Sequence, residues 1–188
     1  MIKEIQDKIK NNNPINEKDK IKFEHIIKNM ELITRNHLTN VATLPNQKWQ
    51  KEIESTHWDK RIKTYFLLYV DLLGDTHLGD IKNVFGTLVK TKKGYSYTKK
   101  KCPRVPFHSD CLQIALYIKA FPKKIPFLTY ASDSDYVIFT PDNCVELRQD
   151  NLDKYYEELI TYQMCWEKKL ELANGDMKTL ALLCKPDF

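Results

Sequence analysis

Residues 64–74, TYFLLYVDLLG, constrain the fold more than any other stretch of this 188-residue chain. Almost every position is aromatic or aliphatic, which is typical of a strand buried on both faces in the middle of a sheet. A second run, LGDIKNVFGTLVK (78–90), follows after the short turn GDTH. Two strands joined by a few turn residues form a β-hairpin. The sequence therefore predicts a sheet at the centre of the fold.

Charged residues interrupt both apolar runs of this hairpin. Asp71 interrupts the first run, and Asp80 and Lys82 stand two positions apart in the second. Because side chains alternate along a strand, we expect Asp80 and Lys82 to point to the same side, with the carbonyl of Ile81 between them. A buried carboxylate costs several kcal/mol unless it is paired or binds a metal, so these charges require partners.

Two kinds of partner fit this pattern. Asp71 and Asp80 on paired strands can approach closely, and two carboxylates with the Ile81 carbonyl form an oxygen site suited to Mg²⁺ or Mn²⁺. Lys82 beside such a metal could position or deprotonate a water, or stabilise charge on a phosphate. The alternative is a buried salt bridge between Lys82 and one aspartate. The hairpin residues alone leave both interpretations open.

The remaining segments mix helices and strands. Asn16 predicts the start of a helix that ends near residue 36, and Ser109 predicts the start of another over 110–121. Residues 49–62 fit either a short strand or a helix. Two strands are expected at 125–132 and 136–140, and Asp150 or Asn151 opens a long final helix. This order predicts an α/β fold, with a small central mixed sheet flanked by helices.

Composition narrows the functional classes. The net charge of +5 favours an anionic partner without proving one. Five scattered cysteines form no C-x-x-C pair, so neither a zinc site nor an iron–sulfur cluster is indicated, and free thiols in a reducing cytosol are expected. No stretch approaches the ~18 apolar residues of a membrane span. The sequence predicts a soluble cytoplasmic protein that does not bind membranes.

The loop over 90–106 is basic and carries two tyrosines. Lysines attract phosphates without regard to sequence, and aromatic rings between them stack on unpaired bases. We therefore expect the loop to contact DNA, single-stranded or at duplex ends, although a solvated lysine-rich loop has the same composition. Its candidate DNA-binding residues are Lys92, Lys93, Tyr95, Tyr97, Lys99, Lys100 and Lys101.

Two residues of the predicted 110–121 helix complete the pattern. Gln113 and Tyr117 are four residues apart, which places them on one face of the predicted 110–121 helix. The order D…D-x-K…Q-x-x-x-Y, with these helices and strands, resembles the PD-(D/E)xK nuclease superfamily. Specifically, it is similar to the RecB-type branch, which includes mitochondrial genome maintenance exonucleases and phage exonucleases. The resemblance covers roughly residues 49–188.

The resemblance implies a restriction-endonuclease-like core over 49–188 and an N-terminal helical extension over 1–48. It implies that Asp71, Asp80 and the Ile81 carbonyl bind Mg²⁺ or Mn²⁺ and that Lys82 is the catalytic lysine, with Asp75 as a second choice for the first acid. Gln113 would orient the lysine or the phosphate, and Tyr117 would touch the DNA backbone. Members with an iron–sulfur cluster carry cysteines on both sides of the motif, and because this chain has none before Cys102, it is expected to lack the cluster.

Further residues stay open as candidates. The family often adds an upstream Glu or His to the metal site, for which Glu52, Glu54, His57 and the more distant His37 are available. His108 could reach a phosphate from the start of its helix. The implied function is a metal-dependent exonuclease that hydrolyses DNA from its ends without reading sequence. The alternative is a non-catalytic nucleic-acid-binding accessory or inhibitor protein with the same fold.

Overall fold

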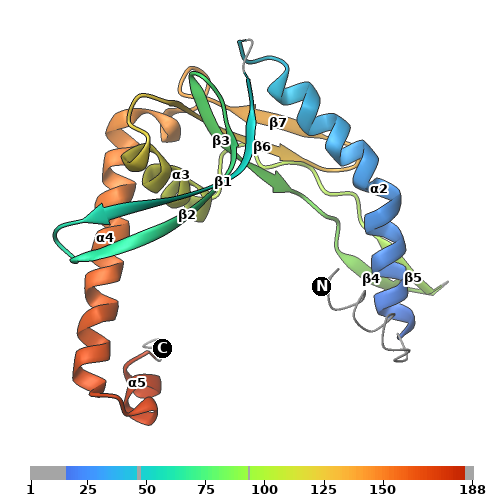
Figure 1. Cartoon of the computed structure of the whole chain (residues 1–188). Helices are drawn as coiled ribbons and strands as arrows, with labels where there is room; N and C mark the ends of the chain where they lie inside the picture. The colour runs from blue at the N-terminus through green and yellow to red at the C-terminus, as the bar shows by residue number, and fades with distance from the viewer. Residues whose placement is uncertain (1–15, 46–47, 93, 185–188) are drawn as a thin grey trace. The chain divides into compact units, whose positions relative to one another are not determined.

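The computed structural model describes residues 16–45, 48–92 and 94–184 and has an α/β architecture (Figure 1). Five strands form a mixed sheet in the order β1-β2-β3-β6-β7, and two more form a separate hairpin. Antiparallel pairs join β1 to β2, β2 to β3 and β6 to β7. The described helices are α2 (Glu17–Val41), α3 (His108–Ala120), α4 (Gln149–Ala173) and α5 (Met177–Leu183), with a short 3₁₀ turn, η1, at Val145–Leu147. The strands are β1 (Gln50–Asp59), β2 (Thr64–Leu73), β3 (His77–Asn83), β4 (Leu88–Thr91), β5 (Gly94–Tyr97), β6 (Ile125–Ala131) and β7 (Tyr136–Phe139).

These elements gather into two compact units. Of the described residues, one unit, here called the α2 unit, holds 16–45, 80–92, 94–105 and 128–139. The other, here called the α4 unit, holds 48–79, 106–127 and 140–184. Each unit is described by itself below. The predicted fold class, a mixed sheet with flanking helices, is confirmed.

Helix α2 lies in the α2 unit and packs against β7. It starts where the sequence predicts, because the Asn16 side chain accepts a hydrogen bond from the Asp19 amide at 2.8 Å. It does not end near residue 36 but continues to Val41. Its last turns bury His37 and Asn40, whose hydrogen bonds to Thr129 take the place of apolar contacts. Apolar periodicity alone therefore places the end of the helix too early.

The α4 unit is built on the β1–β2 hairpin, with α3 against β1 and α4 against α3. Strand β2 buries Leu68 and Val70 but leaves Tyr65, Leu67 and Tyr69 exposed. The prediction that this strand is buried on both faces is therefore wrong, since only its even-numbered side chains face the core. Residues 49–62, whose sequence fits either a strand or a helix, contain β1, which pairs with β2 along nearly its whole length.

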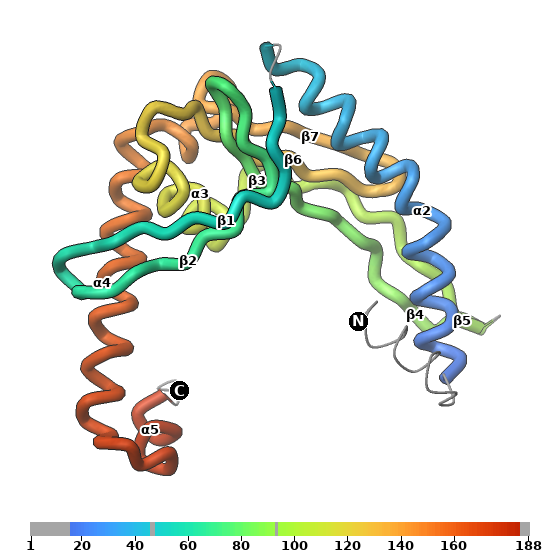
Figure 2. The backbone as a smooth tube through the Cα atoms, viewed as in Figure 1, coloured from blue at the N-terminus to red at the C-terminus, as the bar shows by residue number. Residues whose placement is uncertain are grey.

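Two helix starts shift relative to the sequence prediction. Helix α3 begins at His108 with Phe107 as its cap, so Ser109 lies inside the first turn. Helix α4 begins at Gln149, one residue before the first predicted opener. Within the basic loop, β4 and β5 form a hairpin that lies beside the first half of α2 (Figure 2). Among the described helices, no 18-residue stretch reaches the hydropathy of a membrane span.

Candidate functional site

Asp80 and Lys82 come together in β3, as the alternation of the strand predicts. The Lys82 ammonium lies 2.5 Å from the Asp80 carboxylate. Asp80 is only 3% exposed, whereas the Lys82 side chain is 26% exposed. A buried carboxylate needs a positive partner, and the partly exposed Lys82 side chain supplies one. The arrangement fits both a catalytic pair and a structural salt bridge.

The glycine before Asp80 allows a close approach inside the α4 unit. A β-carbon added at Gly79 would stand about 2.5 Å from the ring of Phe127. Phe127 is fully buried, so the ring cannot move aside without disturbing the core. Gly79 also pairs with Leu72 across the β2–β3 ladder. A rigid, tightly packed residue therefore stands immediately before Asp80 in the strand.

Asp71 lies near the end of β2 in the α4 unit and is half-buried. The flanking pairs Lys51↔Leu72 and Ile53↔Val70 place Glu52 across from it on β1. Glu52 has a φ of 53°, a left-handed conformation that costs a non-glycine residue roughly 1–2 kcal/mol. Strain of this kind gathers at functional sites, so it singles out Glu52 among the open candidates. Sequence alone could not reveal it.

Three other acidic or histidine candidates have different surroundings. Asp75, the second choice for the first acid, lies in the exposed β2–β3 turn and accepts a hydrogen bond from the Lys48 amide at 3.3 Å. Glu54 is exposed on β1. His57 contacts the Tyr156 hydroxyl at 3.0 Å, and burial lowers its pKa below the ordinary value against the opposing charge of Asp59.

His37 and His108 are both engaged by neighbouring side chains. His37 is buried in the α2 unit, where its ring nitrogens lie 3.0 Å from Thr129 Oγ1 and 3.0 Å from Asn83 Oδ1. Because Asn83 directly follows Lys82, His37 braces the end of the strand that carries the ion pair. His108 opens α3 and contacts the Glu158 carboxylate at 2.9 Å.

Gln113 and Tyr117 also meet, as their spacing predicts. Gln113 Nε2 donates to the Tyr117 hydroxyl at 2.5 Å, and that hydroxyl donates to the Tyr69 carbonyl on β2. Tyr117 is only 2% exposed. In this structure, therefore, the tyrosine fixes helix α3 to β2 and orients Gln113. Its contact with the DNA backbone stays a prediction.

The predicted DNA-binding loop divides into two parts. Lys92 and Tyr95 belong to the β4–β5 hairpin, whereas Lys99, Lys100 and Lys101 follow it in an exposed segment without regular structure. Tyr97 stacks on His25 with ring centroids 3.7 Å apart, so one face of its ring is covered. Burial raises the pKa of Tyr97 above its ordinary value. Lys93 lies outside the described residues.

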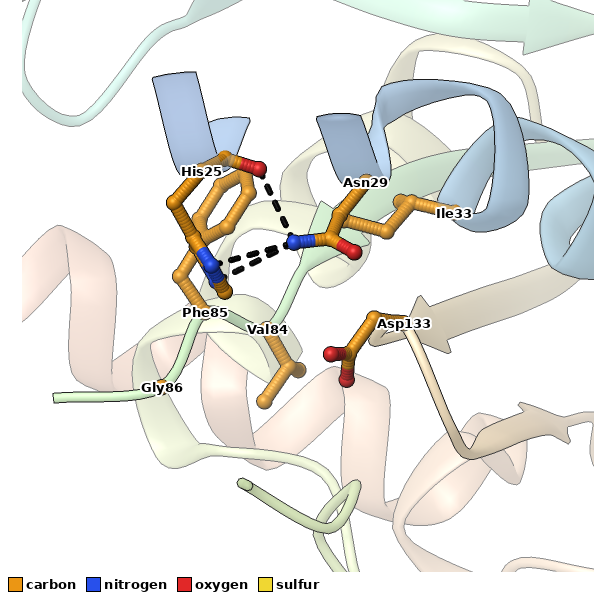
Figure 3. A pocket seen from close by; sticks show the side chains of 7 residues that line it. All are labelled: His25, Asn29, Ile33, Val84, Phe85, Gly86 and Asp133. Carbon is orange, nitrogen blue, oxygen red and sulfur yellow. Dashed lines mark hydrogen bonds between the residues drawn. The ribbon is translucent and has the colours of Figure 1, made fainter. Parts of the chain in front are cut away.

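A small cleft in the α2 unit lies beside this hairpin. Figure 3 shows His25 and Asn29 of α2 on one side of it and Asp133 on the other. The Asn29 amide donates to the His25 carbonyl at 2.9 Å, and it also lies 3.1 Å from the His25 ring. The cleft leaves no room for a water-sized molecule. It is therefore a packed polar contact between the helix and the strand end.

The side chains of the motif suit the metal that the resemblance implies. Asp71 and Asp80 offer carboxylate oxygens and Ile81 a carbonyl, which are the donors that Mg²⁺ and Mn²⁺ prefer. Within the described ranges, no three His, Cys, Asp or Glu side chains gather in a geometry that could hold a metal ion. The implied set has only two such side chains. The pairing of Asp71 with Asp80 around a metal stays a prediction.

Comparisons with known proteins give little further guidance. The sequence matches no protein-family model and no curated protein. One solved structure, described as "Crystal structure of SSO0001", is 12% identical, with a TM-score of 0.40. The similarity covers 81% of this chain and 69% of that one.

Proposed function

We propose that this chain is a metal-dependent DNA exonuclease that hydrolyses phosphodiester bonds from DNA ends. The observation that carries the proposal is the Asp80–Lys82 ion pair, in which a buried carboxylate holds an ammonium at 2.5 Å in β3. An acid and a lysine side by side supply the two charges that phosphodiester hydrolysis needs, one to hold a cation and one to face the phosphate.

The proposed roles follow from the surroundings of each group. Asp80, Asp71 and the Ile81 carbonyl would hold Mg²⁺ or Mn²⁺, which when bound supplies an activated water and neutralises phosphate charge. Lys82 keeps a positive charge at a partly exposed position, where it can face a scissile phosphate. Gln113, held by Tyr117, orients the lysine or the phosphate.

The same ion pair also favours a second candidate function. A lysine that already neutralises Asp80 is what a purely structural salt bridge requires. In that case the chain is a non-catalytic nucleic-acid-binding protein, an accessory or inhibitor, which uses its basic segments and performs no hydrolysis. The two candidates share DNA as the partner and differ in whether bonds are broken.

Cleavage assays with single carboxylate variants separate the two. End-labelled linear DNA and closed circular DNA are incubated with Mg²⁺, with Mn²⁺ or with EDTA. We expect the wild-type protein to degrade only the linear DNA, and only with metal. Asp80→Asn and Asp71→Asn should abolish cleavage, whereas Asp75→Asn should retain it. Glu24→Gln, which alters an exposed carboxylate on α2, is the matched control.

The outcomes lead to distinct conclusions. Metal-dependent cleavage that survives Asp80→Asn would show that another site or a contaminating enzyme is responsible. Rapid cutting of the circular DNA would point to an endonuclease. A wild-type protein that binds DNA but leaves it intact with both metals would favour the accessory protein.

A further inference from the structure

We propose that a basic cleft in the α2 unit binds an unpaired nucleic-acid strand, with its phosphates on four cations and a base on Tyr136. This inference takes from the proposed function only that the ligand is a nucleic acid. It adds which kind of strand binds and which residues hold that strand. The cleft is formed by the segment after β5 and the turn between β6 and β7, and its volume is about 570 Å³. Its walls are Lys99, Lys100, Lys101, Cys102, Pro103, Arg104, Ser134, Asp135, Tyr136 and Val137.

Hydrogen bonds join the two walls of the cleft. The Asp135 carboxylate accepts from the Cys102 amide at 2.8 Å and from the Tyr136 amide at 3.0 Å. The Cys102 thiol donates to the Asp135 carbonyl, and Ser132 Oγ accepts from the Asp135 amide at 2.9 Å. The segment after β5 is thereby fixed to the β6–β7 turn. A ligand does not need to order these walls, which lowers the cost of binding.

The charge in the cleft is strongly one-sided. Lys99, Lys100, Lys101 and Arg104 are exposed, and in the described part of the chain no carboxylate forms an ion pair with any of them. The single acid in the walls, Asp135, is occupied by two backbone amides. Four neighbouring cations without counter-ions repel one another, and a chain of phosphates relieves that repulsion.

Tyr136 selects for an unpaired strand. Tyr136 is 47% exposed, and its backbone amide is hydrogen-bonded to Asp135, so this aromatic residue is accessible at a wall of the cleft that also carries cations. Base–aromatic stacking tolerates any base, but the base must be free of its own stack. A duplex offers phosphates to the lysines and no free base face to Tyr136. Sequence analysis missed Tyr136 and Arg104 because they lie outside the lysine-rich run.

Binding to labelled oligonucleotides tests the proposal without cleavage. The probes are a fluorescein-labelled oligothymidylate and a blunt duplex of the same length, measured by anisotropy in EDTA. We expect Tyr136→Leu to weaken binding of the single strand roughly ten-fold and leave duplex binding unchanged, while Tyr136→Phe binds like the wild type. Tyr65→Leu, at an exposed tyrosine of β2, is the matched control.

Salt dependence tests the four cations. We expect a variant with Lys99, Lys100, Lys101 and Arg104 all changed to Gln to reduce the slope of log K against log salt by about 0.7 for each phosphate that the variant no longer binds. A control variant removes the same charge from α2, by changing Lys18, Lys20, Lys28 and Arg35 to Gln. Its slope should stay steeper than that of the cleft variant.

The two proposals can fail separately. Strand binding that depends on Tyr136, in a protein that never cleaves DNA, supports the cleft and overturns the nuclease. Cleavage by a protein whose Tyr136→Leu and cleft-lysine variants bind the single strand like the wild type overturns the cleft alone. Equal losses in the Tyr65→Leu and Tyr136→Leu variants, or in the two charge variants, would also overturn it.

Discussion

Asp80 and Lys82 form an ion pair in which the acid is buried and the lysine reaches the surface. Removing the lysine leaves the carboxylate charge in the strand without that counter-ion. We expect Lys82→Ala to lower the free energy of unfolding by ~3 kcal/mol. Changing Asp80→Asn in the same protein should restore part of the loss, because the buried charge disappears. Urea unfolding followed by tryptophan fluorescence measures both values, and Lys28→Ala on α2 is the control.

A divalent cation offers a second readout of the same pair. If Asp80 binds Mg²⁺ or Mn²⁺, the ion replaces the missing positive charge, and the Lys82→Ala variant should gain more thermal stability from added metal than the wild type does. The Lys82→Ala, Asp80→Asn double variant should gain nothing beyond the wild type. A single variant that stays destabilised at saturating metal would indicate that the lysine is a structural counter-ion.

The tip of the β1–β2 hairpin is anchored to α4 by Asp59. This buried carboxylate accepts from the Arg61 guanidinium at 2.9 Å and from the Tyr156 hydroxyl at 2.6 Å. Arg61 holds the pKa of the Asp59 carboxyl well below its usual range, with burial acting in the opposite direction. Burial and the bond to Asp59 raise the pKa of Tyr156 to about 12. The hairpin and the helix are thus joined by an ionised acid.

This anchor predicts how stability depends on pH. A carboxyl whose pKa is lower in the folded state stabilises the fold above its unfolded pKa of ~3.9, and that stability is lost as the pH falls below it. We expect Asp59→Asn to cost ~2 kcal/mol at pH 7, since hydrogen bonds to a charged group are lost. Between pH 5 and pH 3, the free energy of unfolding should then fall less in the Asp59→Asn variant than in the wild type. Parallel pH profiles of the two proteins would contradict the assignment.

The sequence predicts best those elements in which apolar residues occupy the buried positions. The β2–β3 hairpin follows from two apolar runs joined by a short turn, and the shared side of Asp80 and Lys82 follows from the alternation of side chains along a strand. The end of α2 and the identity of β1 do not, because hydrogen-bonded polar residues such as Asn40 and Asp59 occupy their buried positions. Polar residues at core positions interrupt the apolar periodicity from which helices and strands are predicted. The strained φ at Glu52 leaves no trace in the sequence at all.

At the scale of the whole molecule, neither compact unit is a continuous piece of chain. Helix α2 belongs with segments that come much later in the sequence, since Asn40 donates to the Val137 carbonyl at 2.9 Å and Asn36 donates to the Ser132 carbonyl at 2.9 Å. The chain crosses between the units at 47–48, 79–80, 105–106, 127–128 and 139–140. A cut after residue 48, where the sequence predicts a domain boundary, therefore removes one wall of the α2 unit.

A pair of truncations tests that boundary. A fragment of residues 49–188 loses the partners of Thr129 and of the Val137 carbonyl, and each buried polar group left unsatisfied costs ~1–3 kcal/mol. We expect hydrogen exchange to show that residues 128–139 lose protection in this fragment. The fragment 16–188 is the reference, because both lack the first fifteen residues and only one lacks α2. Equal protection of 128–139 in the two fragments would instead show that α2 is not needed to order these residues, which would favour the separate N-terminal extension that the resemblance implies.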